Sequence, residues 1–190
     1  FGDKFFQIPY AKDKDKFFRS LNDIVLEENV DYIFPNVDEE LSIFAEHNKI
    51  GNAKVIISPL ASVKNTIDKY QLYLSFRDHF HCPETFLLED FSFKEGEWVV
   101  KPRFGRGSKD IFHADTKQMF DSLIGYLTCI GYNNQNLIIQ EKLPGKEYTV
   151  DVLCDMSGSE IAIIPRERIH TSGGISAIGK TKKDNYLISI

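Results

Sequence analysis

The chain has 190 residues, of which 42% are hydrophobic and 27% charged, a balance that suits a globular protein with a sizeable core. Its net charge of −5 does not favour a nucleic-acid partner. No run of about 18 apolar residues occurs, so we expect no membrane span. The basic residues of the second half gather at 101–109 and 166–183, a pattern typical of a region that binds an anion.

The three cysteines, Cys82, Cys129 and Cys154, are far apart and form no CxxC pair. This spacing argues against a disulfide framework and indicates a reducing, cytoplasmic environment. We expect all three to be small buried hydrophobes. The chain begins at Phe1 with neither Met nor a signal-peptide pattern, which we interpret as a boundary inside a longer protein.

Short apolar strands alternate with amphipathic helices over residues 1–58. Such alternation favours βαβ units and a parallel sheet. Because the strands are too few for a complete doubly wound domain, we interpret this part as the C-terminal half of a Rossmann-like domain. The elements expected from apolar spacing are strands at 5–8, 31–35 and 54–57 and helices at 15–28 and 37–47.

The remainder of the chain has a different pattern. Residues 59–82 read as a helical linker, and Pro83 marks a boundary. From there on we expect an α+β region with mostly antiparallel strands. Its expected elements are strands at 85–88, 97–101, near 111, at 137–140, 147–153 and 160–165, and a helix at 116–130.

A strand that delivers a lysine into a glycine-containing loop is the central feature of this region. The stretch at residues 99–108 reads VVKPRFGRGS. Glycines let the backbone approach a ligand closely and present N–H groups to phosphate oxygens. Lys101 at the strand end would supply a positive charge to the same phosphates.

Other glycine motifs fit this loop less well. A Walker A loop needs Gly-Lys-Ser/Thr, whereas Gly107 is followed by Ser108 and Lys109. A dinucleotide fingerprint needs a third glycine where the chain has Asp110. A protein kinase places its glycine loop before its lysine. The alternative of a plain hairpin turn with exposed basic residues stays open.

A second motif follows at residues 137–152, which read LIIQEKLPGKEYTVDV. It combines an apolar strand, a polar hinge, a turn and an alternating strand. A period of two places Glu147, Thr149 and Asp151 on one face, with Val150 and Val152 on a core face. An edge strand with a solvated polar face is the alternative interpretation.

Together these motifs resemble the ATP-grasp superfamily, and within it the branch similar to the carbamoyl-phosphate synthase large subunit. The resemblance covers residues 31–190. It rests on several blocks in the family's order: 35–41 (PNVDEEL), 68–69 (DK), 101–103 (KPR) with 105–108 (GRGS), 140–151, 165–168 (PRER) and 173–176 (GGIS).

The resemblance implies a nucleotide held between a small lid, residues 83–139, and a larger lobe that starts at 140 and is cut short at 190. Residues 1–58 would then belong to the pre-ATP-grasp domain. The residues that the resemblance assigns to the nucleotide are Lys69, Lys101 and Arg103 for the phosphates, Gly105, Gly107 and Ser108 in the closing loop, Gln140, Glu141 and Leu143 in the adenine-binding hinge, and Glu147 for the ribose.

The implied reaction is ATP-dependent ligation through an acyl phosphate, with ATP and a small carboxylate as partners and Mg²⁺ as cofactor. Arg166 and Arg168 resemble residues that face the acceptor or the transferred phosphoryl group, although a surface turn after Pro165 is the alternative. The family's magnesium ligands would lie beyond residue 190, so we expect no metal ligand here and doubt that this part alone is active. A non-catalytic nucleotide-binding module is the alternative function. We expect neither nucleic acid nor membrane as partner, and a homodimer is left open.

Overall fold

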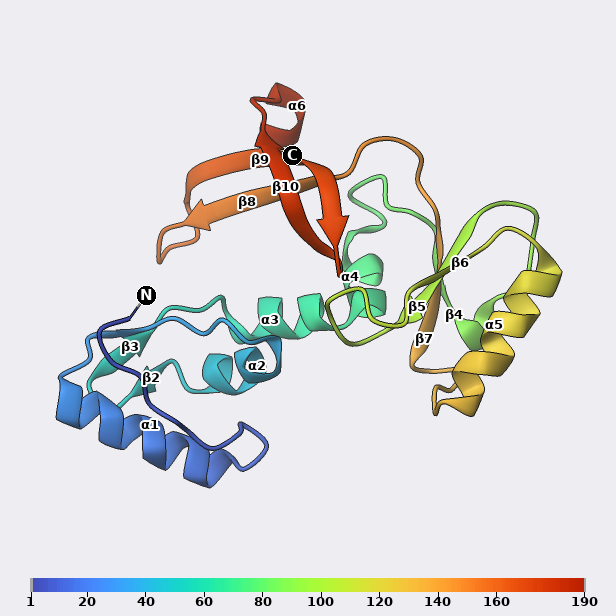
Figure 1. The fold of residues 1–190 in the computed structure, drawn as a ribbon. Helices are drawn as coiled ribbons and strands as arrows, with labels where there is room; N and C mark the ends of the chain where they lie inside the picture. The colour runs from blue at the N-terminus through green and yellow to red at the C-terminus, as the bar shows by residue number, and fades with distance from the viewer. Residues whose placement is uncertain (1, 190) are drawn as a thin grey trace. The chain divides into compact units, whose positions relative to one another are not determined.

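The structure, a computed structural model, describes residues 2–189 apart from the side chain of Ile175. The chain divides into two compact units, unit 1 at Phe1–His81 and unit 2 at Cys82–Ile190 (Figure 1). The finer expected division into segments 1–58, 59–82, 83–139 and 140–190 stays a prediction.

Unit 1 packs helices on a small mixed sheet. Its described elements are α1 (Lys14–Glu28), β1 (Tyr32–Ile33), α2 (Asp38–Glu46), β2 (Lys49–Ile50), β3 (Ala53–Val55), α3 (Leu60–Ile67) and α4 (Lys69–Phe76). Strand β3 lies in the centre of the sheet, parallel to β1 and antiparallel to β2. The core is aromatic, since the buried rings of Phe17 and Phe44 contact each other edge to face with their centroids 5.6 Å apart.

Two expectations for unit 1 were wrong. Residues 5–8 form no strand, because this apolar stretch has no partner strand among the described residues. The sheet is mixed rather than parallel, because β2 and β3 form a hairpin through residues 51–52. A two-residue strand is too short to show a period-two pattern in the sequence.

Unit 2 contains two antiparallel sheets. Its described elements are β4 (Thr85–Leu87), the 3₁₀ helix η1 (Leu88–Asp90), β5 (Trp98–Pro102), β6 (Phe112–Ala114), α5 (Lys117–Cys129), β7 (Leu137–Glu141), β8 (Tyr148–Cys154), β9 (Glu160–Ser172), β10 (Ile175–Thr181) and α6 (Asn185–Ile188). The first sheet has the order β4-β7-β5-β6 and the second is the meander β8-β9-β10.

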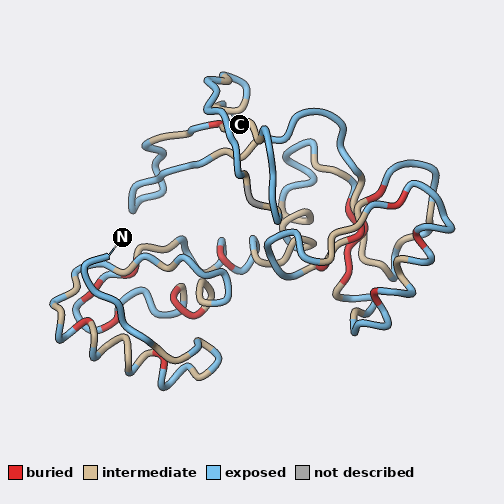
Figure 2. Tube along the Cα trace, in the orientation of Figure 1, coloured by how far each residue is buried: buried red, intermediate tan, exposed pale blue. Residues whose placement is uncertain are grey.

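Helix α5 covers one face of the first sheet. Thr116 caps this helix, because its side chain accepts a hydrogen bond from the Met119 N–H at 3.3 Å. The burial alternation along β5 directs Trp98 and Val100 into a core shared with Leu127 of α5. Figure 2 shows buried residues along β5 and β7 and mostly exposed chain along β8–β10. The opposite face of β5 is therefore left to the polar side chains described below.

The second sheet differs from expectation in its extent. Strand β9 continues through Pro165 to Ser172, so the alternative of a surface turn after Pro165 is wrong. The Pro165 carbonyl accepts from the Lys182 N–H at 2.9 Å, just past the end of β10. Since the N and O of a strand residue point to the same side, the missing N–H of this proline faces the point where β10 stops. Strand β10 and helix α6 were not predicted.

Burial expectations also failed in places. Val152, expected on a core face, is 58% exposed, because nothing in the described chain covers that part of the meander. Cys129 and Cys154 are exposed and Cys82 is half-buried, so the cysteines are not the buried hydrophobes that we expected. They are all free thiols. Among the described residues no helix is both long and apolar enough to cross a membrane.

The α5 core generates a stability prediction. Leu127→Ala should destabilise unit 2 by about 2–5 kcal/mol, because the side chain is fully buried and its loss leaves a cavity. Met119→Ala on the same helix removes a side chain that is 46% exposed, and should change stability by less than about 0.5 kcal/mol. Urea unfolding followed by circular dichroism measures both, and equal losses would contradict the packing described here.

Candidate functional site

Lys101 and Gln140 lie on the face of the first sheet that is turned away from α5. The register pairs Val99 with Gln140 and Lys101 with Ile138, so Lys101 and Gln140 are diagonal neighbours. The Lys101 Nζ donates a hydrogen bond to Gln140 Oε1 at 2.6 Å. The structure thus joins the predicted phosphate lysine and the predicted hinge residue in one polar pair.

Thr85, on the neighbouring strand β4, bonds to the other end of the Gln140 amide. Gln140 Nε2 donates to Thr85 Oγ1 at 2.8 Å, and the Thr85 hydroxyl donates to the Pro83 carbonyl at 2.9 Å. Only 3% of Thr85 is exposed, so its hydroxyl fixes which way the Gln140 amide points. Sequence reasoning missed this residue, because only the pairing of β4 with β7 places it opposite Gln140.

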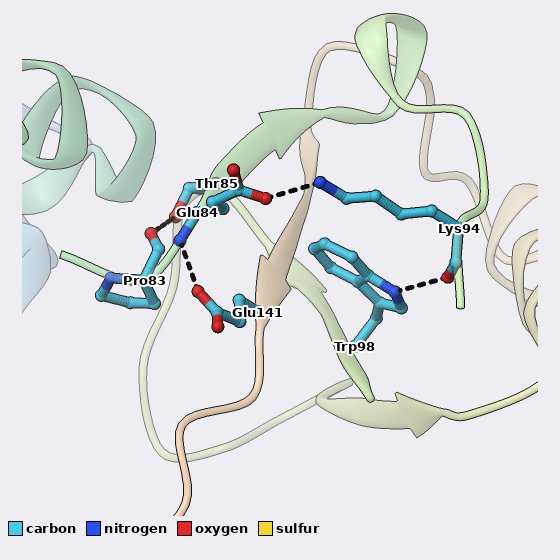
Figure 3. A network of polar contacts seen from close by, with 6 residues as sticks. All are labelled: Pro83, Glu84, Thr85, Lys94, Trp98 and Glu141. Carbon is cyan, nitrogen blue, oxygen red and sulfur yellow. Dashed lines mark hydrogen bonds and ion pairs between the residues drawn. The ribbon is translucent and has the colours of Figure 1, made fainter. Parts of the chain in front are cut away.

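Glu141, the last residue of β7, holds the start of the hinge in place. The Glu141 carboxylate accepts from the Glu84 N–H at 3.2 Å, as Figure 3 shows, and the Glu84 side chain pairs with Lys94 at 2.6 Å. The Trp98 indole N–H donates to the Lys94 carbonyl at 3.0 Å, which ties this contact to the core. Leu143, just past the strand, is 47% exposed and so is available to cover a ligand.

The glycine loop leaves the end of β5 in an unusual backbone conformation. Gly105 has φ of 110° and Gly107 of 68°, and the non-glycine residues Ser108 and Asp110 have φ of 54° and 56°. Glycine at 105 and 107 tolerates these positive φ values and lets the backbone approach an anion closely. Residues 104–109 are all exposed. The loop therefore has both the shape and the access that phosphate binding requires.

The same loop lies against the turn between β9 and β10. A Cβ atom added to Gly174 would lie 2.0 Å from Ser108 Oγ and 2.9 Å from Ser108 N. Gly174 itself has φ of 76°. The close approach and the left-handed backbone both require glycine at this position. The contact joins two motifs that are 66 residues apart in the sequence.

Acidic residues of β8 face arginines of β9 on one side of the meander. Glu147, which precedes β8, pairs with Arg168, whose second Nη donates to the Gly174 carbonyl at 2.6 Å. Arg166 pairs with Asp151 at 3.3 Å. The Nε atoms of both arginines are buried and have no hydrogen-bond partner among the described residues. The face that we expected to be acidic and hydroxylic thus carries two cations as well.

Two further residues assigned to the phosphates are held in different ways. Arg103 donates from its backbone N–H to the Asn136 carbonyl at 2.9 Å, and its guanidinium lies 5.3 Å from the Phe104 ring centroid. Lys69 begins α4 in unit 1, next to the cap Asp68. Burial lowers the pKa of Lys69, and the nearby carboxylates of Asp68 and Asp38 oppose that shift.

No group of three or more His, Cys, Asp and Glu within the described residues could hold a metal ion.

The comparisons with known proteins identify the family. A model of the ATP-grasp domain matches residues 66–187, which is well over half of the chain. The chain therefore belongs to the ATP-grasp domain family. None of the curated proteins matches it in sequence.

Solved structures show the same fold. The chain is similar to an L-amino acid ligase from Bacillus licheniformis, with a TM-score of 0.64, 14% identity and coverage of 88% of this chain and 40% of that one. A D-alanine-D-alanine ligase from Coxiella burnetii has a TM-score of 0.57 and 17% identity, over 73% of this chain and 44% of its own.

A third structure is the biotin carboxylase domain of a 2-oxoglutarate carboxylase from Hydrogenobacter thermophilus, which was solved with MgADP. Its TM-score is 0.62 at 14% identity, over 87% of this chain and 40% of that one. At such identities the similarity shows the fold alone, and it confirms the mixed fold class that we expected. The chain spans about two fifths of the length of these structures.

The buried Thr85 hydroxyl generates the second prediction. Thr85→Val keeps the shape but leaves Gln140 Nε2 and the Pro83 carbonyl without their partner, so it should cost about 1–3 kcal/mol of stability. Thr128→Val makes the same substitution at an exposed site of α5 and should cost under about 0.5 kcal/mol. Urea unfolding compares the two variants, and equal stability of Thr85→Val and the parent protein would contradict the network.

Proposed function

We propose that this chain is the ATP-binding part of an ATP-dependent ligase that joins a carboxylate to an amine. The single observation that carries the proposal is the pair formed by Lys101 and Gln140 at the base of the glycine loop. A cation at a strand end, an oriented amide and an exposed glycine loop are the kinds of group that bind the parts of a nucleotide. Membership of the ATP-grasp domain family supports this interpretation.

The phosphates of ATP would bind beside Lys101, where β5 ends and the glycine loop begins. Lys101 would leave Gln140 Oε1 for a phosphate oxygen, and residues 105–108 would supply backbone N–H groups. The family resemblance also assigns Lys69 of unit 1 to a phosphate, and a phosphate bound to Lys69 would raise the pKa that burial has lowered. Arg103 lies at the entry to the loop and would extend the same positive surface.

The adenosine would bind along the hinge. Gln140 and Glu141 end β7, and a purine edge would replace hydrogen bonds that their side chains now make with Lys101, Thr85 and Glu84. The half-exposed Leu143 would cover the ring. Glu147 would accept from the ribose hydroxyls. Its side chain is 65% exposed, so the ion pair with Arg168 is weak enough for a ligand to compete with it.

The acceptor would be a small carboxylate beside Arg166 and Arg168. In the reaction, a carboxylate oxygen attacks the γ-phosphorus of ATP, the bond to the bridging oxygen breaks and ADP leaves. The amine then attacks the acyl carbon, phosphate departs and the nitrogen loses a proton. The guanidinium groups of both arginines on one face of the meander support anion binding at this place. Magnesium would neutralise the phosphates when bound, but the described residues offer no cluster to hold it.

The branch of the family is a finer proposal. Biotin carboxylase structures are among the similar ones, which supports kinship with the carbamoyl-phosphate synthase branch. Amino-acid ligases match as well, so amino-acid ligation is at least as well supported. A cytoplasmic location and a homodimer are parts of the same proposal. The alternative is a module that binds nucleotide without catalysis.

The nucleotide assignment predicts the outcome of two substitutions. Lys101→Met and Glu147→Gln should each weaken ATP binding by about 1–3 kcal/mol, because each removes a charge that bonds to the ligand. Lys117→Met, on the far side of α5 from the β5 site face, removes an exposed charge and should leave the affinity unchanged. Isothermal titration with ATP measures all three, and unchanged affinity in both site variants would refute the assignment.

The ligase proposal predicts acceptor-dependent turnover. The naturally expressed protein, given MgATP and a panel of amino acids, should release ADP faster with at least one amino acid present. Arg168→Lys should lower that stimulated rate about 10-fold or more, because lysine cannot bind a carboxylate in a bidentate manner. ATP binding without any stimulation would instead favour the non-catalytic module.

A further inference from the structure

The connection between α5 and β7, residues 131–136, is a rigid turn built from its own side chains. Asn133 Oδ1 accepts from the backbone N–H groups of Gln135 at 3.0 Å and Asn136 at 3.1 Å. In return, Asn136 Oδ1 accepts from the Asn133 N–H at 2.7 Å. Such reciprocal bonding fixes the backbone of a short segment that would otherwise be free to move.

This connection holds the first end of the glycine loop. The Arg103 N–H donates to the Asn136 carbonyl at 2.9 Å, and Arg103 Nη1 donates to the Gln135 carbonyl at 3.4 Å. Pro102, the residue before, is paired with Leu137 in the β5–β7 register. The loop therefore departs from a point that is bonded to the connection through both backbone and side chain.

The same connection holds the second end of the loop. The Tyr132 hydroxyl donates to Asp110 Oδ2 at 2.7 Å, and this bond raises the pKa of Tyr132. The Tyr132 side chain is half-buried against the core under α5. The backbone N–H of Tyr132 donates to the Leu127 carbonyl at 3.0 Å. Tyr132 is thus fixed by the core and reaches outward to the loop.

Asp110 is held in a backbone conformation that costs energy for its residue type. Its φ of 56° lies in the left-handed region, which aspartate tolerates better than most residues but does not prefer. A bond to a charged acceptor is stronger than a neutral one and can offset this cost. The contact with Tyr132 is therefore what keeps the end of the loop in its observed turn.

We propose that residues 131–136 are the mount of the glycine loop, and that Tyr132 is a positioning residue that sets how readily the loop at 103–110 opens. None of these connection residues belongs to the proposed nucleotide contacts. The mount acts on the ligand only through the loop, and its effect on phosphate binding rests on the function proposed above.

The first experiment measures loop opening without any ligand. Trypsin cleaves after Arg106 and Lys109 only when the loop extends into the active site of the protease, so the cleavage rate reports how often the loop leaves its observed turn. Tyr132→Phe removes the hydroxyl and keeps the ring in the core, so cleavage should become about 10-fold faster. Tyr126→Phe, at a half-exposed site on α5, is the control and should leave the rate unchanged.

A second pair of variants separates the hydrogen bond from the backbone conformation. Asp110→Asn keeps a side-chain acceptor and tolerates a positive φ, so it should retain slow cleavage. Asp110→Gly relieves the backbone but removes the acceptor, so it should match Tyr132→Phe. The double variant Tyr132→Phe/Asp110→Gly should be no faster than either alone, since both remove one bond. Slow cleavage in Asp110→Gly would overturn the proposal.

The third measurement adds ATP to the same proteins. Isothermal titration should show that Tyr132→Phe binds ATP several-fold more weakly than the parent, whereas Asp110→Asn keeps the affinity of the parent. Thermal unfolding of Tyr132→Phe should give the same melting temperature as that of the parent. Unaltered cleavage and affinity in Tyr132→Phe would overturn the mount. If the parent protein binds no ATP, the proposed function fails, and the cleavage rates still decide the mount by themselves.

Discussion

The hydrogen bond between Lys101 and Gln140 is the constraint on which the candidate site depends. A half-buried ammonium group needs an acceptor, and the amide of Gln140 is turned toward it because Thr85 takes the other end of that amide. The pair exists only because β5 and β7 are antiparallel in one register. A slip of one strand by one residue would put Lys101 and Gln140 on opposite faces of the sheet and break the pair.

The second constraint is the close contact between the glycine loop and the β9–β10 turn, which depends on backbone conformation more than on side chains. Ser108 lies so close to Gly174 that no Cβ fits between them. The carbonyl of Gly174 is in turn bonded to Arg168, which pairs with Glu147. One continuous series of contacts therefore runs from the loop to the carboxylate proposed for the ribose.

The charges of the second sheet are balanced within the protein itself. Arg166 and Arg168 each pair with a carboxylate of the β8 side, so their charge is not freely offered to an anion. The carboxylates of both pairs are more than half exposed, so a ligand can reach the carboxylate side of each pair and compete for it. In the absence of a ligand, Asp151 and Glu147 balance the charges of Arg166 and Arg168, and a bound anion would take the place of these carboxylates.

The sequence by itself determined the elements that bury one clear face. Helices α1 and α5 were predicted to within a residue or two at each end, because their apolar residues recur at helical spacing. The glycine loop after Lys101 and the family resemblance were also predicted from the sequence, since both depend on residue order along the chain.

Only the tertiary structure decided the rest. The end of β9 and the existence of β10 were hidden because residues 169–172 and 177–181 are exposed on both faces, which leaves no period-two signal. The contacts of Gln140 with Thr85, of Asp110 with Tyr132 and of Ser108 with Gly174 join residues far apart in the sequence. Strand register and chain reversal bring those residues together, and neither is written in the local pattern of residues.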